Sequence, residues 1–414
     1  MEKLDKVVDL LKKYNQEHLI KGIEKLNSEE QEKLLDQILS IDFDLMKSLY
    51  EKTKTKPDLG GGKVEPIEHT DKDKLTAEEM KYYYDKGAEV IRKGEYAVVT
   101  MAGGQGTRLG YTAPKGTFPI IENISLFEGL ATTIKEAMAE FNSIIPWYLM
   151  TSRENNDATV KFFEEHNYFG LDKENVVFFK QGELPMCGTD GKILIDENGN
   201  IKLAADGHGG VFESMYRNGV IDDMKKRGIK WMFISGVDNV LAKTVDAVLT
   251  GLAIDKNVLA AGKSVVKSNP KERVGVFCKK NGRPYVIEYT EISDEMAEML
   301  DENGELLYGE SHILCNLFNI KEIEEVCKNK LPYHSAFKKA KYIDENGELV
   351  VPTEPNAYKF EAFIFDAFER LSDMVILRVK REEEFAPLKN ADGVDSPDTA
   401  RKLYLNYLNS KKNK

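Results

Sequence analysis

A glycine-rich segment near residue 105 contains the residue types best suited to chemistry in this chain of 414 residues. Gly103, Gly104 and Gly106 follow a short apolar run, and glycines let backbone N–H groups approach a ligand without a side chain in the way. Arg108 and Lys115 lie just beyond them and add fixed positive charge, which suits phosphate groups. The pattern predicts a loop that binds a polyphosphate.

The loop departs from the two most common phosphate-binding motifs. The P-loop pattern G-x-x-x-x-G-K-[ST] is absent, because no Lys-Ser or Lys-Thr pair follows Gly110. The dinucleotide fingerprint G-x-G-x-x-G is missed by one residue, and Pro114 lies where its first helix would run. The second predicted strand ends in Met150-Thr151-Ser152, without the acid that binds a ribose hydroxyl. A dinucleotide-dependent oxidoreductase is therefore disfavoured, although it stays one of the alternatives.

Four short apolar runs predict the strands that position this loop, at residues 96–101, 145–150, 176–179 and 231–237. Helical patterns lie between them at 126–141, 155–166 and 211–227. This alternation predicts an open α/β sheet, which binds ligands beyond the carboxyl ends of its strands. Asp238 directly follows the fourth run, and a carboxylate there suits Mg²⁺ held jointly with substrate phosphates.

The flanking regions divide the chain into three predicted parts: a helical segment at 1–94, a central domain at 95–330 and a C-terminal region at 331–414. The first part contains a helix headed by Ser28, a loop or linker at 56–74, and a helix from the Thr76 capping box to about residue 93. Strands are expected at 274–278, 284–289 and 313–320, and a last helix at 397–409. Asp-Glu-Asn-Gly at 196–199, 301–304 and 344–347 predicts three hairpin turns.

Composition narrows the functional classes. Lys and Arg number 58 against 70 Asp and Glu, and the net charge of −12 argues against a general basic surface for nucleic acid or anionic membranes. A local basic pocket for a nucleotide is compatible with that charge. No apolar run approaches about 18 residues, and the N-terminus has no signal-like apolar segment, so we expect a cytoplasmic protein. The four cysteines form no C-x-x-C pair and are expected to be buried, reduced thiols.

The motifs of this chain resemble those of the UDP-sugar pyrophosphorylases, and more narrowly those of the eukaryotic-type UDP-N-acetylhexosamine pyrophosphorylases. The segment 102–110, followed by Pro114-Lys115-Gly116, carries the general nucleotidyltransferase part of the resemblance. The narrower part rests on the segments 359–366 and 381–391, and matching segments run in the family's order from about residue 76 to 403. The resemblance implies a Rossmann-like, GT-A-like nucleotide-diphosphosugar transferase fold with a mixed central sheet, an N-terminal helical segment and a small C-terminal α+β domain.

The resemblance also implies a reaction. UTP and N-acetyl-α-D-glucosamine 1-phosphate would give UDP-N-acetylglucosamine and diphosphate by in-line, Mg²⁺-assisted uridylyl transfer. A UTP–glucose-1-phosphate uridylyltransferase, or a broad UDP-sugar pyrophosphorylase, is the alternative, because His208 stands where N-acetylhexosamine enzymes tend to carry Asn. A non-catalytic sensor of nucleotide sugars is disfavoured by the complete set of phosphate and metal residues. No nucleic acid or membrane partner is implied, and the oligomeric state is left open.

The family's site residues carry over position by position. The implied catalytic cations are Arg108, Lys115 and Lys389, and the implied metal ligand is Asp238. Phe363 and Phe365, two residues apart, are expected on one face of a strand, where they would enclose the N-acetyl methyl group. The remaining positions would bind the nucleotide, at Gly103, Gly104, Gly106, Gln181, Gly207 and His208, or the sugar and its phosphate, at Gly275, Glu288, Asn316 and Lys359.

Overall fold

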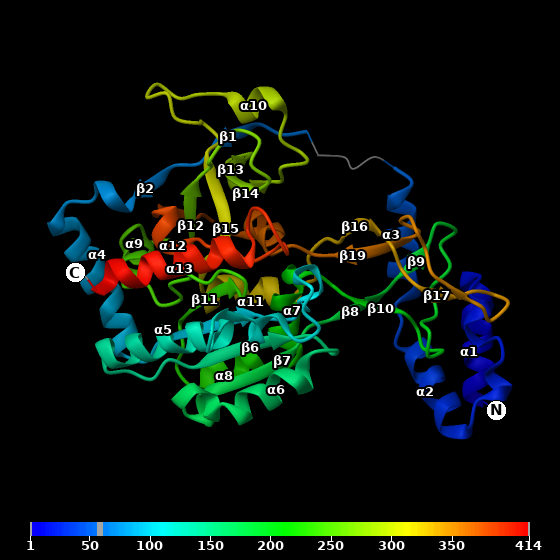
Figure 1. The fold of residues 1–414 in the computed structure, drawn as a ribbon. Coiled ribbons are helices and arrows are strands. Elements are labelled where there is room, and N and C mark those ends of the chain that lie inside the picture. Colours follow the sequence, from blue (N-terminus) through cyan, green and yellow to red (C-terminus); the bar gives the residue numbers. More distant parts are fainter. Residues whose placement is uncertain (1, 56–60, 413–414) are drawn as a thin grey trace. The chain divides into compact units, whose positions relative to one another are not determined.

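The computed structural model describes residues 2–55 and 61–412, whose helices and strands are drawn in Figure 1. The backbone packs into two compact units, and each unit is assembled from three separate stretches of chain. Unit 1 comprises Met1–Gly60, Gly182–Gly210 and Pro332–Phe363, and unit 2 comprises Gly61–Gln181, Val211–Leu331 and Ile364–Lys414. These packing units cross the boundaries expected at residues 94 and 330, so the three-part division stays a prediction about domains.

Unit 2 is built on a mixed sheet that has 11 strands within the described residues. Its main path runs in the order β2-β20-β12-β15-β11-β3-β6-β7, and β1, β13 and β14 branch from β15. β15 is antiparallel to both of its neighbours on the path, whereas the other pairs are parallel. The strands are β1 (Val64–Pro66), β2 (His69–Asp71), β3 (Tyr96–Met101), β6 (Trp147–Thr151), β7 (Val176–Lys180), β11 (Trp231–Gly236), β12 (Ala260–Val266), β13 (Val276–Lys280), β14 (Arg283–Ile287), β15 (Glu310–Asn319) and β20 (Val375–Arg378).

The central strands of this sheet are buried along their whole length. Every residue of β3, β6 and β11 is buried, which is typical of parallel strands covered on both faces and explains their near-continuous apolar sequences. Aromatic side chains extend the core onto the helices, with the rings of Phe127 and Phe163 centred 5.0 Å apart. The helices of unit 2 are α4 (Ala77–Arg92), α5 (Leu126–Phe141), α6 (Asn156–Glu165), α7 (Val211–Arg217), α8 (Val220–Lys226), α9 (Ala247–Asp255), α10 (Asp294–Glu298), α11 (Ile320–Lys328), α12 (Arg381–Glu384) and α13 (Pro397–Lys412).

Unit 1 combines three N-terminal helices with short antiparallel strands. Val7, Leu11, Phe43 and Met46 from the helices pack in one apolar core with Phe360 from β19. The helices are α1 (Glu2–Tyr14), α2 (Ser28–Leu39) and α3 (Phe43–Thr53). The strands are β8 (Glu183–Pro185), β9 (Cys187–Gly188), β10 (Leu203–Ala205), β16 (His334–Lys338), β17 (Tyr342–Ile343), β18 (Leu349–Val350) and β19 (Ala357–Glu361).

Three details of the predicted elements are wrong. The cap of α2 is Asn27 rather than Ser28, because the Asn27 side chain accepts the N–H of Glu30 and the Glu30 carboxylate accepts the N–H of Asn27. The expected helix at 211–227 is two helices, α7 and α8, separated where Gly219 takes a φ of +71°. The expected linker at 56–74 contains β1 and β2, which pair with β13 and β20; residues 56–60 lie outside the described part.

The hairpin turns are confirmed at all three Asp-Glu-Asn-Gly segments. The Asp carboxylate accepts backbone N–H groups two and four residues later in each turn, and the Gly has φ between +78° and +81°. Antiparallel pairs close the turns, Ile195 with Ile201, Leu300 with Leu306, and β17 with β18. The four cysteines are buried free thiols, as expected. None of the described helices is long and apolar enough to cross a membrane.

Candidate active site

The glycine loop leaves β3 and folds back on itself. The N–H of Lys115 donates to the carbonyl of Gly104 at 3.1 Å, and Gln105 forms a β-bridge with Pro114. A Cβ added at Gly104 would meet nothing within 4 Å, so the backbone is open to a ligand there. A Cβ at Gly106 would come 2.8 Å from the Tyr111 side chain, which makes that glycine a requirement of the loop's own packing.

Gly103 and Gln181, two residues assigned to the nucleotide, lie against each other. A Cβ at position 103 would overlap the side-chain oxygen of Gln181. The backbone N–H of Gln181 donates to the carbonyl of Thr151 at 2.7 Å, where β6 and β7 end side by side. The carboxyl ends of neighbouring strands thus bring both residues to the same edge of the sheet.

Asn155 secures this loop, and sequence reasoning missed it. Its side chain is fully buried, its amide nitrogen donates to the carbonyl of Ala102 at 2.9 Å, and its amide oxygen accepts the N–H of Ser152 at 2.8 Å. The segment after β6 is thereby tied to the start of the glycine loop. Asn155 stands in a polar run that the sequence assigned to a helix start, so nothing in its pattern indicated a long-range contact.

Lys115 and Asp238 form an ion pair at the carboxyl ends of the adjacent strands β3 and β11. The distance from Nζ to Oδ2 is 3.7 Å, and the side chains keep 17% and 24% of their area exposed. The carbonyl of Asp238 accepts the N–H of Leu388 at 2.9 Å, which places the neighbouring Lys389 backbone at the same edge. Arg108 is an exposed residue of a short turn in the glycine loop. The structure therefore brings together the Lys115, Asp238 and Lys389 backbone segments.

Asn239 anchors the segment that carries Lys389. Its amide nitrogen donates to the carbonyl of Glu384 at 2.7 Å, and its amide oxygen accepts the N–H of Ala386 at 2.9 Å. The side chain is buried, so one amide holds the 384–389 segment beside the end of β11. The sequence pattern singled out Asp238 but gave no reason to assign a role to the residue after it.

A buried cluster of charged side chains includes Glu384, at the start of the same 384–389 segment. Nζ of Lys263 lies 2.6 Å from Oε2 of Glu384 and 2.8 Å from Oδ2 of Asp246. Lys72 lies 3.3 to 3.4 Å from the same two carboxylates. Burial alone would lower the pKa of Lys263, but Asp246 and Glu384 raise it above its ordinary value. Burial would likewise raise the pKa of Glu384, but Lys263 and Lys72 lower it, so the cluster stays ionised near neutral pH.

Three residues assigned to the sugar contact His312, and a fourth, Glu288, lies beside one of them, Gly275. The carbonyl of Gly275 accepts the backbone N–H of His312 at 2.8 Å, and Oδ1 of Asn316 lies 3.2 Å from its Nε2. The ring of Phe365 is centred 5.9 Å from the His312 ring. Glu288 follows the end of β14, and its Oε1 would lie 3.0 Å from a Cβ at Gly275. His312 itself was missed, because a single histidine in an apolar strand shows no ligand spacing.

The expectation that Phe363 and Phe365 share one strand face is wrong. β19 ends at Glu361, and Phe365 lies in a 3₁₀ helix at Ile364–Arg370. A period of three residues replaces the alternation of a strand there, so Phe365 and Phe368 lie on the same side instead. Phe363 belongs to unit 1, and Phe365 belongs to unit 2.

The other assigned residues of unit 1 gather around Phe363. Gly207 has a φ of +88°, and a Cβ there would overlap the carbonyl of Ala362. The ring of His208 is centred 5.3 Å from that of Phe363, and the ring of His334 stacks on Phe363 at 4.9 Å. Lys359 forms a 2.7 Å ion pair with Glu361. Unit 1 therefore brings Gly207, His208 and Phe363 together.

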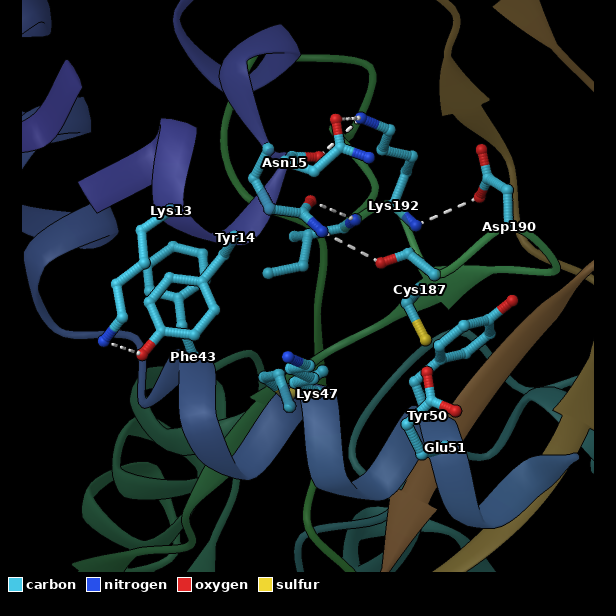
Figure 2. Close-up of a pocket in the computed structure, with 14 residues that line it drawn as sticks. Lys13, Tyr14, Asn15, Phe43, Lys47, Tyr50, Glu51, Cys187, Asp190 and Lys192 are labelled. Atoms are coloured by element: carbon cyan, nitrogen blue, oxygen red, sulfur yellow. Dashed lines mark hydrogen bonds between the residues drawn. The ribbon is translucent and has the colours of Figure 1, made fainter. Parts of the chain in front are cut away.

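Unit 1 also contains a pocket that none of the assigned residues lines (Figure 2). Tyr14 and Phe43 stack on one side of it, with ring centroids 5.2 Å apart. Gln16 accepts the N–H of Ile193 and donates to the carbonyl of Gly191, which joins α1 to the hairpin after β9. The pocket therefore lies where the N-terminal helices pack against this hairpin.

Comparisons with known proteins agree with the motifs. Residues 41–396 match the family model described as UTP–glucose-1-phosphate uridylyltransferase. UDP-N-acetylhexosamine pyrophosphorylase-like protein 1 of Xenopus tropicalis is 39% identical over 344 residues, which cover 79% of this chain and 66% of the frog protein. UDP-N-acetylglucosamine pyrophosphorylase of Saccharomyces cerevisiae is 38% identical over 414 residues, which cover 95% of this chain and 85% of the yeast protein.

A solved structure extends the match to three dimensions and confirms the expected fold class. The uridine diphosphate N-acetylglucosamine pyrophosphorylase of Trypanosoma brucei, in complex with an inhibitor, aligns with a TM-score of 0.82 and 31% identity, over 98% of this chain and 85% of that one. The mixed sheet of unit 2 and the N-terminal helices are thus those of a nucleotidyltransferase. The chain belongs to the UTP–glucose-1-phosphate uridylyltransferase family and, within it, to the UDP-N-acetylglucosamine pyrophosphorylases.

Proposed function

We propose that this protein transfers the uridylyl group of UTP to N-acetylglucosamine 1-phosphate, releasing diphosphate. The observation that carries the proposal is the pairing of Lys115 with Asp238, 3.7 Å apart, beside a glycine loop at the carboxyl edge of the sheet. A cation for phosphates and an oxygen ligand for a metal thereby stand together where open α/β sheets bind nucleotides.

The proposed chemistry needs position and positive charge rather than a covalent intermediate. A phosphate oxygen of the sugar phosphate attacks the α-phosphorus of UTP in line, and the bond to the diphosphate breaks. Backbone N–H groups of Gly103 and Gly104, with Arg108 and Lys115, are assigned to hold the triphosphate and the departing diphosphate. Lys389 adds a further cation, because its segment is hydrogen-bonded to the backbone of Asp238.

Asp238 fits a Mg²⁺ ion that is shared with substrate. No group of three or more His, Cys, Asp or Glu among the described residues is arranged to hold a metal by itself. A single protein carboxylate that is partly exposed suits the binding mode in which Mg²⁺ takes one protein ligand and completes its shell with phosphates and water. When bound there, the ion would neutralise charge on the phosphates.

The assignment of the acetylated sugar rests on the named relatives and on Phe365. Phe365 is 8% exposed and offers an apolar wall to a methyl group, whereas Glu288 and Asn316 offer polar atoms to sugar hydroxyls. Glucose 1-phosphate is the second candidate substrate, because His208 departs from the residue that the N-acetylhexosamine branch tends to carry. We further propose a cytoplasmic location, which suits four buried free thiols.

One assay tests the proposal. Diphosphate release is measured from UTP and Mg²⁺ with N-acetylglucosamine, N-acetylgalactosamine or glucose 1-phosphate, in parallel. The expected result is the highest kcat/KM with N-acetylglucosamine 1-phosphate and measurable activity with glucose 1-phosphate. A higher kcat/KM with glucose 1-phosphate would replace the proposed substrate, and absence of release with every sugar phosphate would overturn the reaction.

A further inference from the structure

β15 contains a bulge between His312 and Asn316. Asn316 pairs with Gly262 of β12, and His312 pairs with Ser264, so three residues of β15 stand opposite one residue of β12. Leu314, in the middle, has a φ of +56°, which is rare for any residue except glycine. In a regular strand, residues four apart lie about 13 Å from each other. The bulge is therefore what lets these two side chains meet.

The amide of Asn316 presents its oxygen to the His312 ring. Oδ1 of Asn316 lies 3.2 Å from Nε2 of His312, so Nε2 carries the proton and donates it. Nδ2 of Asn316 is buried and has no hydrogen-bond partner, and the whole side chain is 0% exposed. A buried donor without an acceptor is unfavourable, so what this position still needs is an acceptor oxygen.

The His312 ring is held in place by three aromatic rings set nearly perpendicular to it. Phe277 is centred 4.9 Å away at 83°, Phe368 at 5.6 Å and 88°, and Phe365 at 5.9 Å and 89°. The backbone N–H of His312 donates to the carbonyl of Gly275. With its ring and backbone both fixed, His312 presents Nε2–H to Asn316 in one direction.

We propose that His312 is a specificity-determining positioning residue of the sugar pocket. By engaging Oδ1, it holds the Asn316 amide with Nδ2 turned away from the His312 ring, so the pocket selects a sugar that brings an acceptor oxygen to Nδ2. By contacting Phe365, it sets the position of the apolar wall at the same time. This inference rests on the proposed function, because it takes Asn316 and Phe365 to face the sugar.

Two substitutions separate the hydrogen bond from the packing. His312→Phe keeps an aromatic ring among the three phenylalanines but removes the donor, and His312→Gln keeps an N–H donor but removes the ring. In His312→Phe we expect the KM for the sugar 1-phosphate to rise about tenfold, the effect of losing one oriented hydrogen bond, while the KM for UTP is unchanged. His312→Gln should recover at least half of that loss on a logarithmic scale.

The shift that UDP causes in the thermal unfolding temperature is measured for each variant. A shift like that of the wild type shows that the variant retains its fold. If His312→Phe does not fold, His312→Met replaces it, because an unbranched thioether fills irregular core space without a strong donor. The matched control is His166→Phe, at an exposed histidine whose ring lies 4.1 Å from Phe162 in α6. The control should have wild-type kinetics.

Two outcomes overturn the inference. One is an unchanged sugar KM in the variant without a donor; the other is an equal rise in the KM values for UTP and for the sugar, which indicates a purely structural role. Failure of the proposed function looks different, because it appears in the wild-type enzyme. If the wild type prefers glucose 1-phosphate, the same comparison of variants is made with that sugar and still tests His312.

Discussion

The ammonium of Lys115 lies 3.7 Å from the carboxylate of Asp238, and the two residues follow adjacent parallel strands. Without nucleotide the two charges compensate each other at the edge of the sheet. In the proposed complex each charge has a different partner: phosphate oxygens for Lys115 and a divalent cation for Asp238. In that proposed complex, UTP and Mg²⁺ would replace one ion pair with two separate interactions, so removal of either residue should have a distinct effect.

Lys115→Ala is expected to lower turnover about a hundredfold or more, the size of effect seen when a preorganised charge contact to a transition state is lost. The free energy of unfolding should change little, because the side chain is outside the apolar core. Steady-state diphosphate release and a urea titration measure the two quantities. Lys161→Ala, at an exposed lysine paired with Glu165 in α6, is the control. Full activity of Lys115→Ala would remove this lysine from the mechanism.

Asp238→Asn keeps the size of the side chain but removes its charge. We expect the Mg²⁺ concentration for half-maximal activity to rise by at least tenfold, or activity to be lost, while UTP binding is partly retained. A Mg²⁺ titration at saturating UTP makes the measurement. Asp398→Asn, at an aspartate that is almost fully exposed, should leave the titration unchanged. A variant curve that superposes on the wild-type curve would rule out Asp238 as the metal ligand.

Glu384→Gln is expected to destabilise the protein by about 3–5 kcal/mol, because it removes a charge that compensates the buried Lys263. Urea unfolding at pH 7 measures the loss. Glu382→Gln, two residues earlier on the exposed side of α12, should lie within about 0.5 kcal/mol of the wild type. An equal effect of both substitutions would mean that the buried cluster contributes nothing specific.

The same cluster predicts how stability depends on pH. The pKa values of Glu384 and Asp246 are depressed: burial opposes ionisation, but Lys263 and Lys72 outweigh it. A carboxyl group whose pKa is lowered by folding stabilises the folded state. This contribution is complete above the unfolded-state pKa of about 4, and it is lost as the pH falls towards the folded-state pKa. The stability difference between wild type and Glu384→Gln should therefore be constant from pH 5 to 8 and shrink below pH 4. A constant difference down to pH 2.5 would contradict this linkage.

Phe365→Ala is expected to reduce kcat/KM about tenfold or more with N-acetylglucosamine 1-phosphate and less with glucose 1-phosphate, since an apolar wall discriminates by about 1–3 kcal/mol per group. The ratio of the two kcat/KM values is the quantity to measure. Phe337→Ala removes a similar ring at a more exposed position and should keep the wild-type ratio. An unchanged ratio in Phe365→Ala would place the acetyl group elsewhere.

The sequence predicted well what depends on local patterns. Continuous apolar runs located β3, β6 and β11, and the change from strand to glycines located the loop. The loop pattern indicated Lys115, the strand end indicated Asp238, and the resemblance added Lys389. The structure brings the backbone segments of all three to one edge of the sheet. The Asn-Gly turns were predicted correctly because the positive φ of the glycine is a local requirement of such a turn.

What the sequence missed depends on irregular backbone or distant contacts. His312 and Asn316 meet only because of a bulge at Leu314, and an extended-strand pattern does not contain that irregularity. Phe365 follows a 3₁₀ period that alternation cannot anticipate. Asn155 and Asn239 act through buried amides on segments far along the chain, and single polar residues in polar runs give no such indication.

Unit 1 has a consequence for how the chain folds during synthesis. Leu11 and Phe43 share a core with Phe360, so the N-terminal helices leave the ribosome long before the strand that completes their packing. At about 5–20 residues per second, the interval is on the order of tens of seconds. During that time the apolar faces of α1 and α3 lack their final neighbours. Chaperone demand and the yield of recombinant protein should therefore depend on this waiting period.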